Sequence, residues 1–141
     1  MILLQPFIKL LSLLPLRVLY VLSSLLYPLV YHVFTYRRVT VRKNLCMSFP
    51  DYPSAEIRRI EKAFYRHFCD LIAEGIKSFS ISSRMLNERV TMTNLDQVRA
   101  FVEQGKSATA ILGHMGNWEW ILLKTAMDAE AVGDQAHFGA L

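Results

Sequence analysis

The chain has 141 residues, is 52% hydrophobic and carries a net charge of +4, which suits one modest domain. Much of the apolar total lies in the first 36 residues, so the rest has the composition of an ordinary soluble protein. Basic and aromatic residues do not alternate anywhere, and no nucleic-acid-binding motif is present in the sequence. We therefore expect no nucleic-acid partner.

Residues 1–36 are predicted to be a membrane anchor. The sequence from Leu10 to Phe34 is almost continuously apolar. At about 1.5 Å per residue it is long enough to cross a hydrocarbon core of about 30 Å. Arg17, Pro15 and Pro28 interrupt it and leave two alternatives open, a spanning helix and a helix lying in the membrane interface. Four tyrosines suit the headgroup boundary in either case: Tyr20, Tyr27, Tyr31 and Tyr36.

Residues 37–53 are predicted to be a basic linker. Four cations follow the anchor closely, which favours contact with anionic lipid: Arg37, Arg38, Arg42 and Lys43. Only Lys9 precedes the apolar segment, so the positive-inside rule predicts that the remainder lies in the cytoplasm. The two cysteines, Cys46 and Cys69, lack metal-ligand spacing, and we expect unpaired thiols in a reducing compartment.

Residues 54–141 begin with a predicted amphipathic helix. Ser54 is a plausible N-cap, and Glu56 falls in the first turn, where the helix dipole favours a carboxylate. Apolar residues recur at steps of three and four and predict the buried stripe: Ile57, Ile60, Phe64, Phe68, Leu71, Ile72, Gly75 and Phe79. The opposite face carries charged residues: Arg59, Lys62, Arg66, Asp70 and Lys77. Glu61 falls toward the apolar stripe and does not fit this pattern.

The next segment predicts an α/β fold. Arg89–Thr93 alternates and is β-branched, which indicates a short strand. Asn94 can cap a helix over Leu95–Gln104, and Gly105 stands where a C′ glycine belongs. Ser107–Leu112 then predicts a buried strand. Strand, helix and strand in this order predict a right-handed βαβ unit, the first of an incomplete α/β domain.

The candidate catalytic residues follow the second predicted strand. His114 would lie beyond the carboxyl end of that strand, where ligands gather in parallel sheets. Gly113 and Gly116 let the backbone turn sharply beside it. Glu119, five residues on, could hold one ring nitrogen while the other faces a substrate. The plain alternative is a buried histidine that bonds a backbone group.

The residues after His114 predict a second helix. Asn117 can cap a helix that starts at Trp118, which would put Glu119 in its first turn. Trp118 and Trp120 have two possible roles, packing in the core or lining an apolar channel. A zinc site is weaker, because only His137 offers a further imidazole and the spacing is not that of a helical zinc site.

Several landmarks in order resemble the bacterial late-acting, lauroyl/myristoyl-type lipid A biosynthesis acyltransferases, of the lysophospholipid acyltransferase superfamily. After the apolar anchor these are Arg38-x-x-x-Arg42-Lys43-Asn44-Leu45, Ser48-Phe49-Pro50, Phe64-Tyr65-Arg66-His67-Phe68 and Gly113-His114-x-Gly116-Asn117-Trp118-Glu119. A His-x4-acid pair alone is a weak motif. Together with Gly-Asn-Trp and the upstream landmarks it is specific.

The resemblance implies an O-acyltransferase of lipopolysaccharide synthesis in the bacterial inner membrane, its catalytic part facing the cytoplasm. His114 would be the general base and Glu119 the residue that orients it, with Gly116, Asn117 and Trp118 as substrate-binding candidates. The donor would be acyl-acyl carrier protein or acyl-CoA, and the acceptor a lipid A precursor. The resemblance implies no metal or organic cofactor.

Two rival functions stay open at this point. One is a glycerolipid or aminolipid acyltransferase with the same dyad, and the other is a non-catalytic membrane-anchored interaction module. Members of the resembled family continue with an acceptor motif that contains arginine. We therefore expect the 141 residues to be an N-terminal portion that is inactive in isolation.

Overall fold

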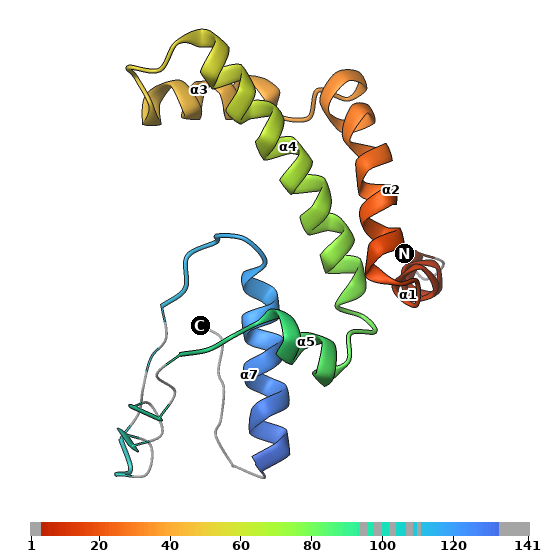
Figure 1. Cartoon of the computed structure of the whole chain (residues 1–141), viewed down its shortest axis with the longest axis vertical. Helices are drawn as coiled ribbons and strands as arrows, with labels where there is room; N and C mark the ends of the chain where they lie inside the picture. Colours follow the sequence, from red (N-terminus) through yellow and green to blue (C-terminus); the bar gives the residue numbers. More distant parts are fainter. Residues whose placement is uncertain are drawn as a thin grey trace. The chain divides into compact units, whose positions relative to one another are not determined.

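The computed structural model describes residues 4–93, 96–97, 100–101, 104–106, 109 and 111–132. The chain forms an N-terminal unit, Met1–Ser80, and a C-terminal unit, Ile81–Leu141. The elements of the N-terminal unit are α1 (Leu4–Ser12), α2 (Leu16–Pro28), the π-helical turn η1 (Leu29–Val33), α3 (Arg38–Ser48) and α4 (Ser54–Lys77). Those of the C-terminal unit are α5 (Ser83–Arg89) and α7 (Trp118–Val132), as Figure 1 shows.

The two prolines divide the apolar N-terminal segment. Pro15 precedes α2 with extended backbone (φ −55°, ψ 141°) and separates it from α1. Pro28 ends α2, and the chain continues as the π-helical turn, in which the Phe34 N–H donates to the Leu29 carbonyl at 2.8 Å. By length and composition, Leu16–Val33 could cross a membrane, with 18 residues and a mean hydropathy of 1.4. It is the one such segment among the described residues.

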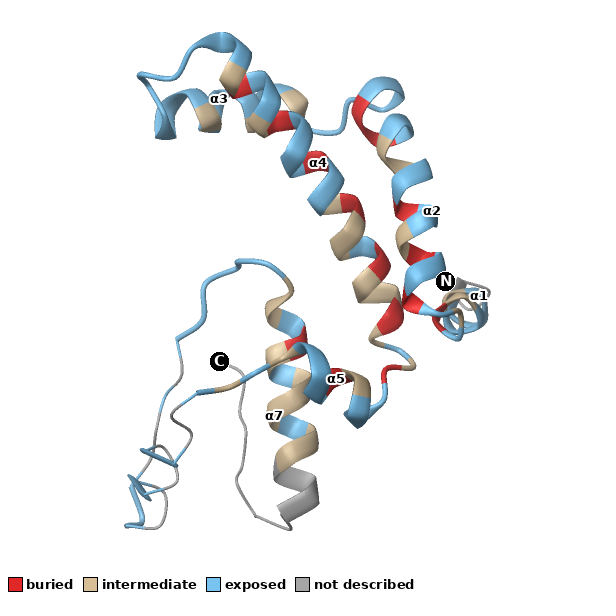
Figure 2. Cartoon of the chain, in the orientation of Figure 1, coloured by how far each residue is buried: buried red, intermediate tan, exposed pale blue. Residues whose placement is uncertain are grey.

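Helix α4 is about 36 Å long at about 1.5 Å per residue and supports the rest of the N-terminal unit. Its buried positions recur every four residues along its whole length (Figure 2): Ile57, Glu61, Tyr65, Cys69, Ala73 and Lys77. The predicted helix is confirmed, and Ile57 is buried as predicted. The predicted buried face is wrong in part, because Phe64 is 43% exposed and Phe79 64% exposed. Ser54 is the first helical residue, and Pro53 holds the N-cap position without a side-chain cap bond.

Lys77 ties the end of α4 to the end of α1. Its ammonium donates to the carbonyl oxygens of Ser12 at 2.8 Å and Leu14 at 3.2 Å. The last carbonyls of a helix have no partner within it, and here the break at Pro15 prevents the helix from continuing. A cation at a helix C-terminus also suits the helix dipole. Lys77 therefore caps α1 from another helix, which explains why a residue predicted to face solvent is buried.

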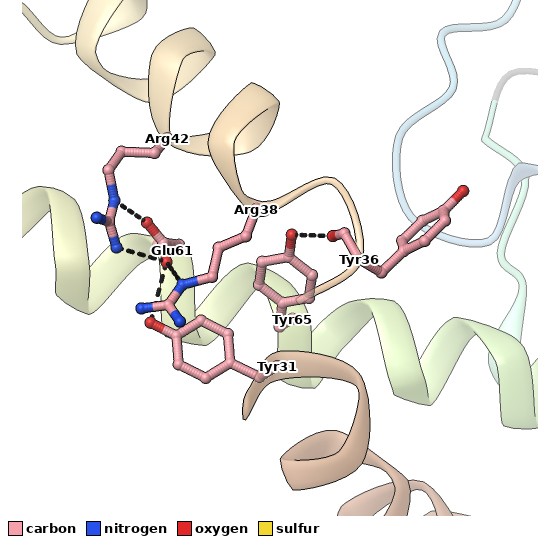
Figure 3. A network of polar contacts seen from close by, with 6 residues as sticks. All are labelled: Tyr31, Tyr36, Arg38, Arg42, Glu61 and Tyr65. Carbon is pink, nitrogen blue, oxygen red and sulfur yellow. Dashed lines mark hydrogen bonds and ion pairs between the residues drawn. The ribbon is translucent and has the colours of Figure 1, made fainter. Parts of the chain in front are cut away.

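Glu61 holds three elements together (Figure 3). Its fully buried carboxylate accepts hydrogen bonds from the Tyr31 hydroxyl at 3.0 Å and Arg38 Nε at 2.9 Å. Arg42 adds two more, from Nε at 2.6 Å and Nη2 at 3.0 Å. These partners come from η1 and α3, so one carboxylate on α4 fixes both elements against it. The misfit of Glu61 in the apolar stripe is explained by these bonds.

Aromatic rings surround this carboxylate and complete the core of the N-terminal unit. The rings of Tyr31 and Tyr65 meet edge to face at 5.3 Å, and the Tyr65 hydroxyl donates to the Tyr36 carbonyl (Figure 3). Val30 and Cys69 are buried in the same cluster. Tyr31 is only 1% exposed, so its place at a headgroup boundary is a prediction that the structure overturns.

The predicted α/β fold and its βαβ unit are wrong, because none of the described residues lies in a strand. Arg89 ends α5, residues 90–93 are irregular, and so are Thr109, Ile111 and Leu112. Parallel strands are stable when helices cover both of their faces. Ile111 is 94% exposed, so the burial that would hold it in a sheet is absent.

Half of the residues of the predicted helix over 95–104 lie outside the described residues, and residues 96, 97, 100 and 101 are helical. Where the chain is described at its end, the predicted C′ glycine is confirmed. Gly105 has a φ of +71°, and the Lys106 N–H donates to the Phe101 carbonyl at 3.1 Å. A bond between residues five apart, across a left-handed glycine, is the Schellman ending of a helix.

The Glu61 cluster makes the N-terminal unit sensitive to acid. Burial raises the pKa of the Glu61 carboxyl, but hydrogen bonds from Arg42, Arg38 and Tyr31 outweigh it and hold that pKa below its ordinary value of 4.5. Because the folded-state pKa lies below the unfolded one, this contribution to the free energy of unfolding is complete above about pH 4.5. It is lost as the pH falls through the folded-state pKa.

We predict that Glu61→Ala lowers the free energy of unfolding by about 2–3 kcal/mol at neutral pH, because it removes the partner of two arginines that are partly solvated. Glu61→Gln should abolish the acid-dependent step. Urea unfolding followed by circular dichroism across the acidic range measures both effects. Glu56→Ala is the control, since the ion-pair partner of Glu56 among the described residues is the exposed Arg59, and its loss should change the free energy of unfolding much less than Glu61→Ala does. Equal effects of the two alanine variants would contradict the role given to Glu61.

Candidate active site

The start of α7 is built as the sequence predicts. α7 begins at Trp118, and the Trp120 N–H lies 3.3 Å from Asn117 Oδ1 and 3.2 Å from the Asn117 carbonyl oxygen. Asn117 is therefore the N-cap. Gly116 precedes it with a φ of +59°, a conformation that favours glycine. Glu119 lies in the first turn of α7, so the predicted helix start, its cap and the place of the acid are confirmed.

Helix α5 holds α7 in place within the C-terminal unit. Trp120 is only 4% exposed, and Ile81 and Leu86 of the same unit are buried too. Core packing is therefore the role of this tryptophan. On the next turns of α7, the Lys124 ammonium contacts Asn87 Oδ1 of α5 at 2.5 Å. An anchored helix gives the residues at its N-terminus a fixed frame.

His114 lies in an exposed loop directly before this helix. Its ring meets the Trp118 ring nearly edge to face, with 4.8 Å between centroids and 66° between planes. A tight turn precedes the cap, in which the Met115 N–H donates to the Gly113 carbonyl at 2.8 Å. The imidazole is thus exposed and contacts the ring of Trp118 in α7. It is not a buried histidine, which was the alternative to a catalytic role.

The structure brings His114 to Trp118 and does not bring it to Glu119. No hydrogen bond or ion pair joins His114 and Glu119 in the described part of the chain, and Glu119 is exposed. Catalytic hydrogen bonds are often long in the free enzyme and tighten when substrate binds. The dyad therefore stays a prediction, with its two members five residues apart at one helix terminus.

The described residues include no group of three His, Cys, Asp or Glu side chains placed to hold a metal ion. Cys46 is exposed and Cys69 is buried, and both are free thiols, as the cysteine spacing predicted. His137, which the sequence offered as a second imidazole, lies outside the described residues.

Sequence reasoning missed the polar residues that organise the N-terminal unit. It assigned Arg38 and Arg42 to lipid, whereas both bind Glu61. Two arginines four residues apart lie on one face of a helix. A lone carboxylate within a predicted apolar stripe needs such a pair, because a buried charge must be compensated. Those two signals together could have found the cluster.

The class of protein follows from comparison with known families. The sequence profile of the family described as "Bacterial lipid A biosynthesis acyltransferase" matches residues 2–133, which cover most of each unit and include the His114 loop. The protein is thus an acyltransferase by family. The chain belongs to the bacterial lipid A biosynthesis acyltransferases, which confirms the resemblance seen in its motifs. No curated protein and no solved structure matches the chain.

We predict that Asn117→Ala frays the first turn of α7, because the Trp120 N–H loses its side-chain partner. A lost N-cap costs about 1 kcal/mol, which corresponds to roughly fivefold faster amide exchange where local opening limits exchange. Hydrogen exchange at the Trp120 amide measures this. Asn117→Asp is the matched control, because its carboxylate caps equally well and should keep the protection. Unchanged protection in Asn117→Ala would show that the cap contributes nothing.

Proposed function

We propose that this acyltransferase moves a fatty acyl group from an acyl thioester to a hydroxyl of a lipid A precursor, with His114 as the general base. The observation that carries the proposal is the accessible imidazole of His114, which contacts Trp118 at the capped start of α7. Imidazole is the side chain that most often serves as a general base, and it can take the proton of a hydroxyl group that attacks a carbonyl.

The chemistry needs only one base and one nucleophile. A ring nitrogen of His114 takes the proton of the acceptor hydroxyl as its oxygen attacks the thioester carbonyl carbon. The tetrahedral intermediate then collapses, the carbon–sulfur bond breaks, and the leaving thiolate receives the proton from the imidazolium. The products are an ester on the acceptor and a free thiol on the carrier, so atoms and charges balance without an oxidant or a metal.

Glu119 is the candidate for orienting the imidazole. It stands on the first turn of α7, one residue after the tryptophan that the His114 ring contacts. A change in side-chain rotamers is the smallest movement that could bring the carboxylate toward a ring nitrogen. A carboxylate there would fix the tautomer and stabilise the imidazolium formed during the reaction.

The charge distribution supports the assignment of donor and acceptor. The N-terminal unit carries eleven lysines and arginines against five aspartates and glutamates, a net charge of +6. A basic surface attracts an acidic acyl carrier protein or acyl-CoA, and equally a phosphorylated glycolipid. Gly116, Asn117 and Trp118 form the turn beside His114 and are the candidates for contacting these substrates. The same basic charge supports a place at the cytoplasmic face of the bacterial inner membrane.

We predict that His114→Ala lowers kcat for acyl transfer by about 10²–10⁴-fold, the usual contribution of a general base. Glu119→Gln should lower it by a smaller factor and shift the pH profile, because the amide cannot stabilise an imidazolium. The measurement follows the transfer of a radiolabelled acyl group from an acyl-carrier thioester to a lipid A precursor. It compares each variant with the unsubstituted protein expressed from the same gene.

The chain offers matched controls for both substitutions. His67 is an exposed histidine of α4, and Glu88 an exposed carboxylate of α5 that pairs with Arg84. His67→Ala and Glu88→Gln should leave transfer unchanged. Transfer that survives His114→Ala would overturn the assignment of the base. Transfer that survives Glu119→Gln with an unchanged pH profile would remove Glu119 from the site.

A further inference from the structure

Helix α2 has one face that binds α4. The two helices run side by side in opposite directions (Figure 1). The Tyr20 hydroxyl donates to Glu74 Oε1 at 2.6 Å, and the Ser23 hydroxyl donates to Asp70. The hydroxyls of Tyr20 and Ser23 therefore point toward α4 and not toward a lipid.

The opposite face of α2 is an uninterrupted apolar stripe. Its members recur at steps of three and four, from 41% exposed at Val18 to 64% at Leu25: Val18, Val21, Leu22, Leu25 and Leu29. The segments before and after α2 also expose large apolar side chains: Phe7, Leu10, Leu13, Val33 and Phe34. These five residues form the outer stripe, four of them in α2 and Leu29 at the start of η1, and no described residue covers it.

A membrane-spanning orientation of α2 conflicts with its partner. Because α4 runs along α2, a bilayer crossed by α2 would also contain the middle of α4. Lys62, Arg66 and His67 are exposed on that stretch. Ionisable side chains in the hydrocarbon core are costly, and they are found there only when they face protein or water.

Separating α2 from α4 would not remove the conflict. Separation would leave the carboxylates of Asp70 and Glu74 without the hydroxyls of α2, and Lys77 without the carbonyls at the end of α1. Those carbonyls would then lack partners close to a lipid phase, where unsatisfied backbone groups are expensive. The polar contacts between the two helices are therefore kept only while α2 and α4 stay together.

We propose that α2 lies in the plane of one leaflet of an anionic phospholipid membrane, with its outer stripe buried among the acyl chains and α4 on the aqueous side. An amphipathic helix with an apolar face and adjacent cations binds membranes in this way. The net charge of +6 on the N-terminal unit favours anionic headgroups. Arg17 precedes Val18 at the edge of the stripe, from which its long side chain reaches the headgroups.

The depth of the outer stripe tests this orientation. Single spin labels are placed at Val18→Cys, Leu25→Cys and Leu29→Cys in a Cys46→Ser background, since buried Cys69 does not react. The protein is bound to phosphatidylcholine vesicles that contain about one third phosphatidylglycerol. Accessibility to oxygen and to a water-soluble nickel complex then gives the depth of each label. We expect all three labels at one shallow depth beneath the headgroups.

Each other outcome overturns the proposal. In a spanning helix the labels at 18 and 29 would differ in depth by about 16 Å, at about 1.5 Å per residue. Labels accessible only to the nickel complex would show that the stripe stays in water. Spin–spin coupling between molecules, with low accessibility to both reagents, would show that a second copy of the chain covers the stripe.

Vesicle binding tests the partner independently of acyl transfer. Leu25→Asp places a charge in the stripe and should weaken binding to the mixed vesicles by about tenfold or more. Val39→Asp is the matched control, because Val39 is 85% exposed on α3, outside the stripe, and should change binding less than about threefold. Circular dichroism checks that both variants fold. Equal binding to vesicles of phosphatidylcholine alone, or equal loss in both variants, would contradict the proposal.

Discussion

The buried carboxylate of Glu61 is the interaction on which the N-terminal unit depends. A buried charge is tolerated only when it is fully paired, and Glu61 takes its partners from η1 and α3. These bonds set the face of α4 that turns inward. The cation of Arg38 also lies 4.3 Å above the Tyr31 ring, so that the aromatic core and the ion cluster fix each other.

The orientation of α4 has a consequence at the other end of the unit. Because the buried positions of α4 recur every four residues, Ala73 and Lys77 lie on the same inward face as Glu61. Lys77 then reaches the open end of α1, and α2 must lie between α4 and the surroundings. One face of the apolar N-terminal segment therefore packs on α4, and the other face is exposed. A basic unit with an exposed apolar stripe suits an enzyme whose family acts in lipid A biosynthesis.

The candidate site depends on local rules to a much greater extent. The start of α7, its Asn117 cap and the turn at Gly116 were all predictable, because caps and glycine turns are set by residues next to one another. Whether residues 89–112 form a sheet could not be predicted in the same way, and the sheet that the sequence predicts is wrong for the described residues. A strand needs partners distant in sequence, and the apolar run that ends at Leu112 has none among the described residues.

The sequence by itself determined the family, the long helix at 54–77, and the place of His114 before a capped helix. Each of these follows from motifs or from contacts within a few residues. Only the tertiary structure decided which face of α4 is buried and where Arg38 points. Hydrophobic periodicity weighs apolar residues alone, whereas the burial of Glu61 and Lys77 depends on hydrogen-bond partners 19 to 65 residues away.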